Sequence, residues 1–124
     1  MATIPLITPD ESGVTAAAMT ATATGGDAFS CPNDTGDYVF LFRNDHSAGI
    51  DVSMVSQLTN KVVQGVGKVS KANQTKTVAA NGGICAFKLS RNEISAYLDN
   101  SGLVNFSYAS WNAALKVVGM KVPA

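Results

Sequence analysis

The stretch YVFLFRN, residues 38–44, decides the fold class of this chain. Its apolar side chains alternate between the two faces of an extended strand, with Tyr38, Phe40 and Phe42 on one face and Val39 and Leu41 on the other. A strand that is apolar on both faces is typical of the interior of a sheet, where other parts of the protein cover it. We therefore expect residues 38–44 to form a central β-strand.

Other short segments with strand character lie on both sides of this stretch, at intervals of about ten residues. They are DAFSC (27–31), IDVSMVSQ (50–57), TKTV (75–78), ICAFKLS (84–90), LVNFSYAS (103–110) and NAALKVVGMKV (112–122), while KVVQGVGKVSK (61–71) fits either a short strand or a long loop. No amphipathic helix is long enough to connect parallel strands. This pattern is typical of an antiparallel sandwich or barrel, and we expect an all-β, jelly-roll-like antiparallel β-sandwich. Its core should be centred on Tyr38, Phe40, Phe42, Val52, Phe87, Phe106 and Val117.

The polar segment SRNEISAYLDNSG, residues 90–102, interrupts the strand pattern. Ser90 and Glu93 have the spacing of a capping box, in which each side chain binds a free backbone N–H at the start of a helix. Ile94, Tyr97 and Leu98 would then share one face of one short helix. Because so short a helix is unstable alone in water, we expect these three side chains to pack against the end of the sandwich.

Residues 1–26 are rich in alanine and threonine and contain few large side chains that could be buried. We expect an extended N-terminal arm or a weakly held edge strand here, followed by a β-sandwich domain over residues 27–124. The large apolar residues near the tip of this arm are Ile4, Leu6 and Ile7. They would either fold back onto their own domain or dock on a neighbour, because leucine and isoleucine are poorly placed in water.

The composition suits one packed domain with a weakly charged surface, since 46% of the 124 residues are apolar and 15% are charged. Nine basic and nine acidic side chains cancel, so we expect neither nucleic acid nor a membrane as a partner. No apolar run reaches the length of a membrane span, and the N-terminus lacks the features of a secretory signal. In the cytosol that we therefore expect, Cys31 and Cys85 should be unpaired thiols.

Few residues of this sequence are suited to catalysis or metal binding. His46 lies in a turn, and one histidine with two cysteines is too few for a zinc site. Asp34 and Asp37 lie in a turn that lacks the pattern of a calcium loop. We therefore expect no enzymatic activity, no cofactor and no metal. Trp111, in the tight link ASWN, is a candidate to pack on the core, to enter a pocket of a partner or to stack on a sugar.

The order of the segments carries a resemblance to a known family. A strand ending at Phe29, the turn NDTGD, the strand YVFLFRN and the segment IDVSM are followed by TVAANGG, CAFKL, YLDNSGLVNFSY and LKVVGMKV. Over most of residues 29–122 this series resembles small phage proteins that decorate, or cement, the mature capsid. The most specific parts are VAANGG before a strand and the tyrosine followed by Asp, Asn and Gly before LVNFSY. The chain departs from the family at residues 90–92, where relatives carry prolines, and matches it weakly at residues 60–73.

The resemblance implies a structural virion protein that is made in the host cytoplasm and stabilises a phage head without chemistry. Its partner would be the major capsid protein, bound from outside the shell, often by a homotrimer of the decoration protein. For the contact with the capsid or a neighbour we expect Ile4, Leu6 and Ile7 of the arm, and Trp111. Two alternatives stay open: a carbohydrate-binding or adhesion module with Trp111 and Tyr108 as a stacking surface, and a phage tail or baseplate component.

Overall fold

A computed structural model describes residues 2–4, 6, 19–31, 37–57, 61–63, 65, 67–69, 72–90, 96–99 and 101–122 of the chain. Within these residues the regular structure consists of β-strands. They are β1 (Ala2–Ile4), β2 (Thr20–Ala21), β3 (Asp27–Ser30), β4 (Asp37–Asn44), β5 (Ile50–Met54), β6 (Lys61–Val63), β7 (Gly67–Val69), β8 (Gln74–Val78), β9 (Gly83–Leu89), β10 (Leu103–Ala109) and β11 (Leu115–Val122). No helix in this described part of the chain is long and apolar enough to cross a membrane.

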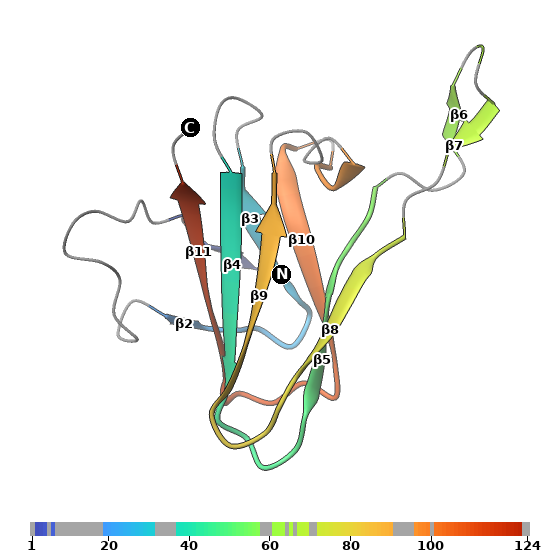
Figure 1. Cartoon of the computed structure of the whole chain (residues 1–124). Helices are drawn as coiled ribbons and strands as arrows, with labels where there is room; N and C mark the ends of the chain where they lie inside the picture. The colour runs from blue at the N-terminus through green and yellow to red at the C-terminus, as the bar shows by residue number, and fades with distance from the viewer. Residues whose placement is uncertain are drawn as a thin grey trace.

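The described strands form a sandwich of two sheets, which Figure 1 shows as two layers with β4, β9 and β11 in front of β3 and β10. The five-stranded sheet has the order β1-β3-β10-β5-β8, and the four-stranded sheet has the order β2-β11-β4-β9. All pairs within these two sheets are antiparallel except β1 with β3. The all-β sandwich that the sequence predicts is therefore confirmed.

The expected central strand, β4, lies between β11 and β9 in the four-stranded sheet. Its register places Phe40 opposite Phe87 of β9 and opposite Gly119 of β11. Along β4 the side chains alternate between fully buried and half-buried positions, and the buried positions begin with Tyr38. The alternation follows the pleat of the strand, so one face of β4 packs into the core and the other faces outward.

Aromatic rings from both sheets meet at the centre of the core. Phe106 of β10 contacts four of them, with ring centroids 5.9 Å from Phe29, 5.0 Å from Phe40, 5.1 Å from Phe42 and 5.5 Å from Phe87. The ring planes are inclined by 61° to 89°, which is the edge-to-face arrangement that aromatic pairs prefer. All seven residues named above as the expected core are buried.

The glycine-interrupted segment around residue 65 contains the two short strands β6 and β7. They pair only with each other in the sheet order, with Lys61 opposite Val69 and Val63 opposite Gly67. Figure 1 shows this hairpin projecting away from the sandwich, beyond the ends of β5 and β8. The sequence left a strand and a loop open for this segment, and the structure has two strands.

Residues 91–95, the first part of the expected helix after Ser90, lie outside the described residues. Ile94 is one of them. The later part is described, and it supports the expected packing: Tyr97 is 1% exposed within the core, and Leu98 packs against it. Asp99 then closes the turn, because its Oδ1 accepts hydrogen bonds from the backbone N–H groups of Ser101 and Leu103 at 2.8 and 3.0 Å. Together with a bond from Asn105, these contacts hold the pKa of Asp99 below its ordinary value.

The described ends of the N-terminal segment are edge strands of the sandwich. β1 lies at the edge of the five-stranded sheet and β2 at the edge of the four-stranded sheet. Ile4 is 5% exposed and belongs to the hydrophobic core, where its strand places it beside Phe29, and Leu6 is partly buried against the same core. For these two residues the arm therefore folds back onto its own domain, which is the first of the two alternatives that the sequence left open. Ile7 lies outside the described residues.

Candidate binding surface

The outer face of the four-stranded sheet carries a continuous group of apolar side chains. On β4, Val39 and Leu41 lie on this face, because they alternate with the buried aromatic residues. The strand register places each of them beside one residue of β11 and one of β9. Leu41 is opposite Val118 and Ala86, and Val39 is opposite Met120. With Ile84 of β9, which precedes Ala86 on the same face, they form what we call the apolar face: Val39, Leu41, Ile84, Ala86, Val118 and Met120.

The apolar face is accessible at the β9 side and becomes more buried toward β11, where Val118 is 4% exposed. Ile84 is 63% exposed, and among the described residues no other large hydrophobic side chain is exposed. Ala86 is also exposed, while Val39, Leu41 and Met120 are half-buried. The sequence predicts that both faces of the central strand are covered, and for this outer face the prediction is correct only in part. Val39 and Leu41 are half-buried there rather than fully buried, and no described strand pairs into a further layer above them.

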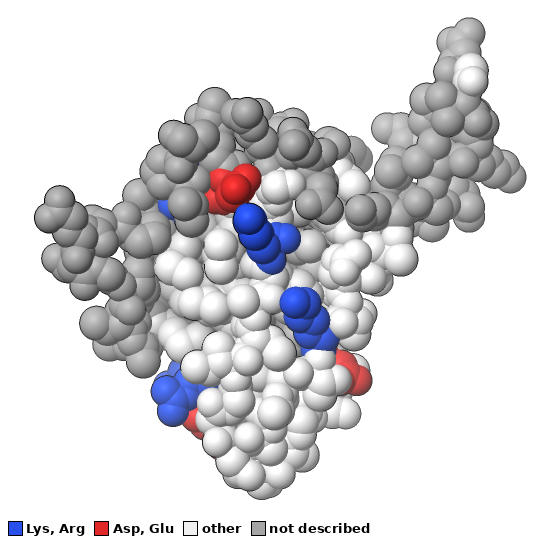
Figure 2. All heavy atoms as spheres, viewed as in Figure 1, with Lys and Arg blue, Asp and Glu red and all other residues white. Residues whose placement is uncertain are grey.

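Basic side chains border the apolar face. Arg43 lies between Lys116 and Ile84 in the register, and Lys88 lies opposite Val39. Arg43 is paired with Asp45, since its Nε lies 2.9 Å from Oδ1 of that carboxylate. Figure 2, which views this side of the molecule, shows a broad uncharged area interrupted by separate basic groups, with acidic groups near its edge. The surface is therefore largely uncharged, with isolated charges of both signs around it.

Trp111 lies in the link between β10 and β11 and is half-buried against the core. Its Nε1 donates a hydrogen bond of 2.9 Å to Oγ1 of Thr22, and this hydroxyl donates one of 2.7 Å to the carbonyl oxygen of Leu115. The indole thus fixes the segment after β2 to the start of β11. Among the roles that the sequence allows for Trp111, packing on the core is the one that the structure displays.

Tyr108 and Asp27 form a second, partly buried polar pair. The Tyr108 hydroxyl donates a hydrogen bond of 2.6 Å to Oδ2 of Asp27, which also accepts one of 3.1 Å from the N–H of Ala23. Burial raises the pKa of Tyr108, and the hydrogen bond and negative charge of Asp27 raise it further. The other oxygen of this fully buried carboxylate, Oδ1, has no hydrogen-bond partner among the described residues.

The structure does not gather the four contact residues expected from the sequence into one exposed surface. Ile4 and Leu6 pack within the domain, Ile7 is not described, and Trp111 is held by Thr22. Sequence reasoning missed the apolar face. The signal that could have found it is the alternation in ICAFKLS, which puts Ile84 and Ala86 on the face opposite to Phe87.

Both cysteines are free thiols, as the sequence predicts. Cys31 is buried, and burial raises the pKa of its thiol from the ordinary 9.0 to about 12. Cys85 is half-buried, and its Sγ lies 3.2 Å from the carbonyl oxygen of Thr77, to which it donates. The buried environment of Cys31 therefore disfavours a reactive thiolate.

The raised pKa of Cys31 predicts a loss of stability in alkali. Above pH 9 the thiol of the unfolded chain ionises while the folded one stays protonated, so the free energy of unfolding should fall by at most about 1.4 kcal/mol per pH unit between pH 9 and 12. Below pH 9 this thiol should have no effect. Denaturant unfolding at pH 7, 9 and 10.5 measures the slope, and Cys31→Ala should decline less steeply than the wild type. Equal slopes for the two proteins would contradict the assignment.

Within the described ranges no three His, Cys, Asp or Glu side chains lie together in a way that could hold a metal ion. His46 is half-buried in the turn after β4, where its backbone N–H binds Oδ1 of Asn44 at 2.9 Å. The described residues thus form a packed body with an apolar outer face and two partly buried polar pairs. Comparison with known proteins gives no match for this chain, whether with family models, curated proteins or solved structures.

Proposed function

We propose that the protein is a structural virion component that decorates the outside of a phage capsid. The proposal combines the family resemblance of residues 29–122 with one structural observation, the apolar face of the four-stranded sheet. In this proposal the apolar face lies against the major capsid protein, and the sandwich acts as a rigid body without chemistry. Trimers, which the resemblance implies, would present three such faces to the shell.

The apolar face has properties that suit a modest, repeated contact. Ile84 provides an exposed aliphatic side chain, and the neighbouring positions on β4 and β11 provide a flat apolar area around it. Accessible apolar area of this kind typically marks a contact with another protein. Because a shell repeats the same surface many times, and a trimer binds it more than once, each single contact can be weak.

The sugar-binding alternative depends on Trp111 and Tyr108 as exposed stacking rings. The polar groups of both side chains are already bonded inside the protein, to Thr22 and Asp27. Tyr108 also packs against the aromatic core, with its ring centroid 6.0 Å from that of Phe42. These contacts favour a structural role for both residues. The tail or baseplate alternative differs only in the partner, so it is separated by locating the protein in the virion.

Purified virions of the phage that encodes the chain provide the test. We expect the protein in the head fraction, at a copy number comparable to that of the major capsid protein by quantitative mass spectrometry. Protein added to capsids that lack it should bind, and Ile84→Asp should reduce this binding at least tenfold, because burying a carboxylate against an apolar partner is costly. Ser107→Asp, at an exposed position on β10 in the other sheet, is the matched control and should bind normally.

Three outcomes would overturn the proposal. The protein could be absent from virions, it could be confined to tails, or Ile84→Asp could bind capsids as well as the control does. Circular dichroism and thermal unfolding of both variants are needed first. Since Ile84 is largely exposed, its replacement should leave the fold intact.

A further inference from the structure

The charges of this chain are separated along the sequence, although they cancel overall. Residues 52–92 contain no Asp or Glu, and they carry five lysines and one arginine. Residues 1–51 contain seven acidic residues and one arginine. Two of these lysines have described side chains, Lys76 of β8 and Lys88 of β9, and both are exposed. We call the surface around these two lysines the basic side, and it should attract negatively charged partners.

The strands β8 and β9 form an unusual hairpin on this basic side. They follow each other in the chain, but β8 pairs with β5 in one sheet and β9 pairs with β4 in the other. Near the turn they are still close, as the 3.2 Å contact from Cys85 Sγ to the Thr77 carbonyl shows. Farther from the turn they diverge. Each strand is the last one in its sheet order, so among the described strands neither has a partner along its outer edge.

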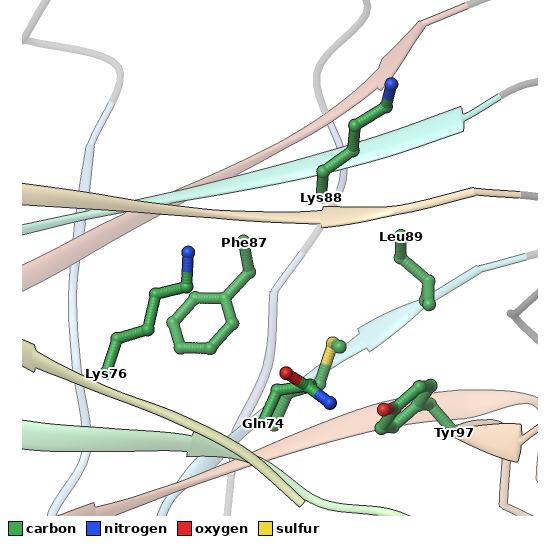
Figure 3. A pocket seen from close by; sticks show the side chains of 7 residues that line it. Gln74, Lys76, Phe87, Lys88, Leu89 and Tyr97 are labelled. Atoms are coloured by element: carbon green, nitrogen blue, oxygen red, sulfur yellow. The ribbon is translucent and has the colours of Figure 1, made fainter.

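A pocket of about 170 Å³ opens where the two strands diverge. Its inner wall consists of four buried side chains, Met54, Phe87, Leu89 and Tyr97, and its mouth is lined by Gln74, Lys76 and Lys88. Figure 3 shows Phe87 and Leu89 on one side of β9 and Lys88 on the opposite side. The pocket therefore has an apolar floor, and one of its walls is the free edge of β9.

Two lysines place positive charge near the pocket, one over its floor and one on the outer side of β9. The Nζ atom of Lys76 lies 5.5 Å from the centre of the Phe87 ring, so its ammonium group sits over the apolar floor. Lys88 projects from the edge strand itself, on the outer side of the sheet. Neither lysine takes part in the ion pair found among the described residues, which joins Arg43 and Asp45. Both charges are available to a ligand.

We propose that the edge of β9 binds an extended peptide segment of a partner protein in which apolar and acidic residues alternate. The segment would pair with the backbone of β9 as an added strand, which is a common mode of peptide recognition. Side chains of such a strand alternate between its two faces. The apolar ones would enter the pocket against Phe87 and Leu89, and the acidic ones would lie beside Lys88 on the outer side. The outer side of this edge borders the apolar face at Lys88, but peptide binding is measured without capsids, so either proposal can fail without the other.

A charged residue that points inward on an edge strand can also serve only to prevent unwanted strand pairing. Lys76 is in such a position. Its partner in the register on β5 is Val52, which is buried, so both side chains point to the inner face of the sheet. A purely protective lysine would bind no peptide with any preference. The two roles therefore differ in a measurable way.

The test uses the full chain and three blocked seven-residue peptides, in which valine alternates with glutamate, with glutamine or with lysine. Backbone amide chemical shifts in NMR follow the binding. We expect saturable shifts at residues 86–89 with the glutamate peptide, an affinity at least ten times that for the lysine peptide, and weaker binding at high salt. The double variant Lys76→Glu/Lys88→Glu should reverse the preference. Lys116→Glu, an exposed lysine on β11, is the matched control and should keep it.

Equal binding of the three peptides, or no binding, would overturn the proposal and favour the protective role of Lys76. A preference for glutamate that survives in the double variant would overturn it too, since the lysines would then not be responsible. Tighter binding of a single-stranded oligonucleotide than of the glutamate peptide would show that the basic side serves nucleic acid instead. Capsid binding by the double variant, measured in parallel, shows whether the two sites are separate.

Discussion

Phe106→Ala is expected to lower the free energy of unfolding by about 3–5 kcal/mol, the range found when a large aromatic side chain is removed from a packed core. Phe106 is fully buried and its ring contacts those of Phe29, Phe40, Phe42 and Phe87, so it joins the two sheets at the centre of the sandwich. Alanine would remove all four ring contacts and leave a cavity. A domain of this size has about 5–15 kcal/mol of stability, so much of it would be lost.

Denaturant unfolding of the variant and of Ser107→Ala measures this effect. Ser107 is the next residue on β10 but is exposed, so its replacement should change the free energy of unfolding by less than about 0.5 kcal/mol. Phe106→Leu should fall between the two variants, because leucine fills part of the space. If Phe106→Ala cost no more than Ser107→Ala, Phe106 would not be the centre of the core.

Gly26→Ala should be the second strongly destabilising change, at about 2–5 kcal/mol. Gly26 precedes β3 and has a φ of 98°, a backbone conformation that disfavours any residue with a side chain. A Cβ atom at this position would also overlap the backbone carbonyl oxygen of Phe106, which cannot move without disturbing the pairing of β3 with β10. Two independent costs therefore add at one position.

Gly102→Ala separates these two costs. Gly102 has a φ of 76°, yet a Cβ atom there would have no heavy atom within 4 Å, so only the backbone strain of about 1–2 kcal/mol should remain. Thermal and denaturant unfolding of both variants provides the comparison. The difference between them gives the cost of the steric overlap at Gly26. Equal effects would mean that β3 and β10 can separate to accept the methyl group.

The strands with strong alternation could be predicted from the sequence, because burial of one face fixes their period. β5 and β10 follow that pattern, whereas β4 and β11 are predictable because they carry apolar residues on both faces, as central strands do. The first two strands could be predicted only as one of two alternatives, since β1 and β2 are two or three residues long and are held by their neighbours rather than by their own pattern. The burial of Ile4 depends on its pairing beside Phe29, which no local signal reveals.

The alternation in ICAFKLS indicates Ile84 and Ala86, but the full extent of the candidate surfaces depends on tertiary structure. The apolar face joins residues of β4, β9 and β11, and only the strand register shows that Leu41, Ala86 and Val118 are neighbours. The pocket depends on the two strands of one hairpin entering different sheets. A cancelling net charge concealed the basic side, because the separation of charges matters there and the total does not. The sequence suggests Trp111 as a contact residue because it is the one tryptophan of the chain, but its indole is hydrogen-bonded to Thr22.

The order of strands has a consequence for synthesis on the ribosome. β3 takes its place beside β10, and β4 beside β11, so strands made early need neighbours that are translated more than 70 residues later. Until then, the aromatic faces of the early strands have nothing to cover them, and such distant pairing is slow. Nascent chains should therefore depend on chaperones until the last strand has left the exit tunnel, and a premature stop before β10 should yield an aggregating product rather than a smaller domain.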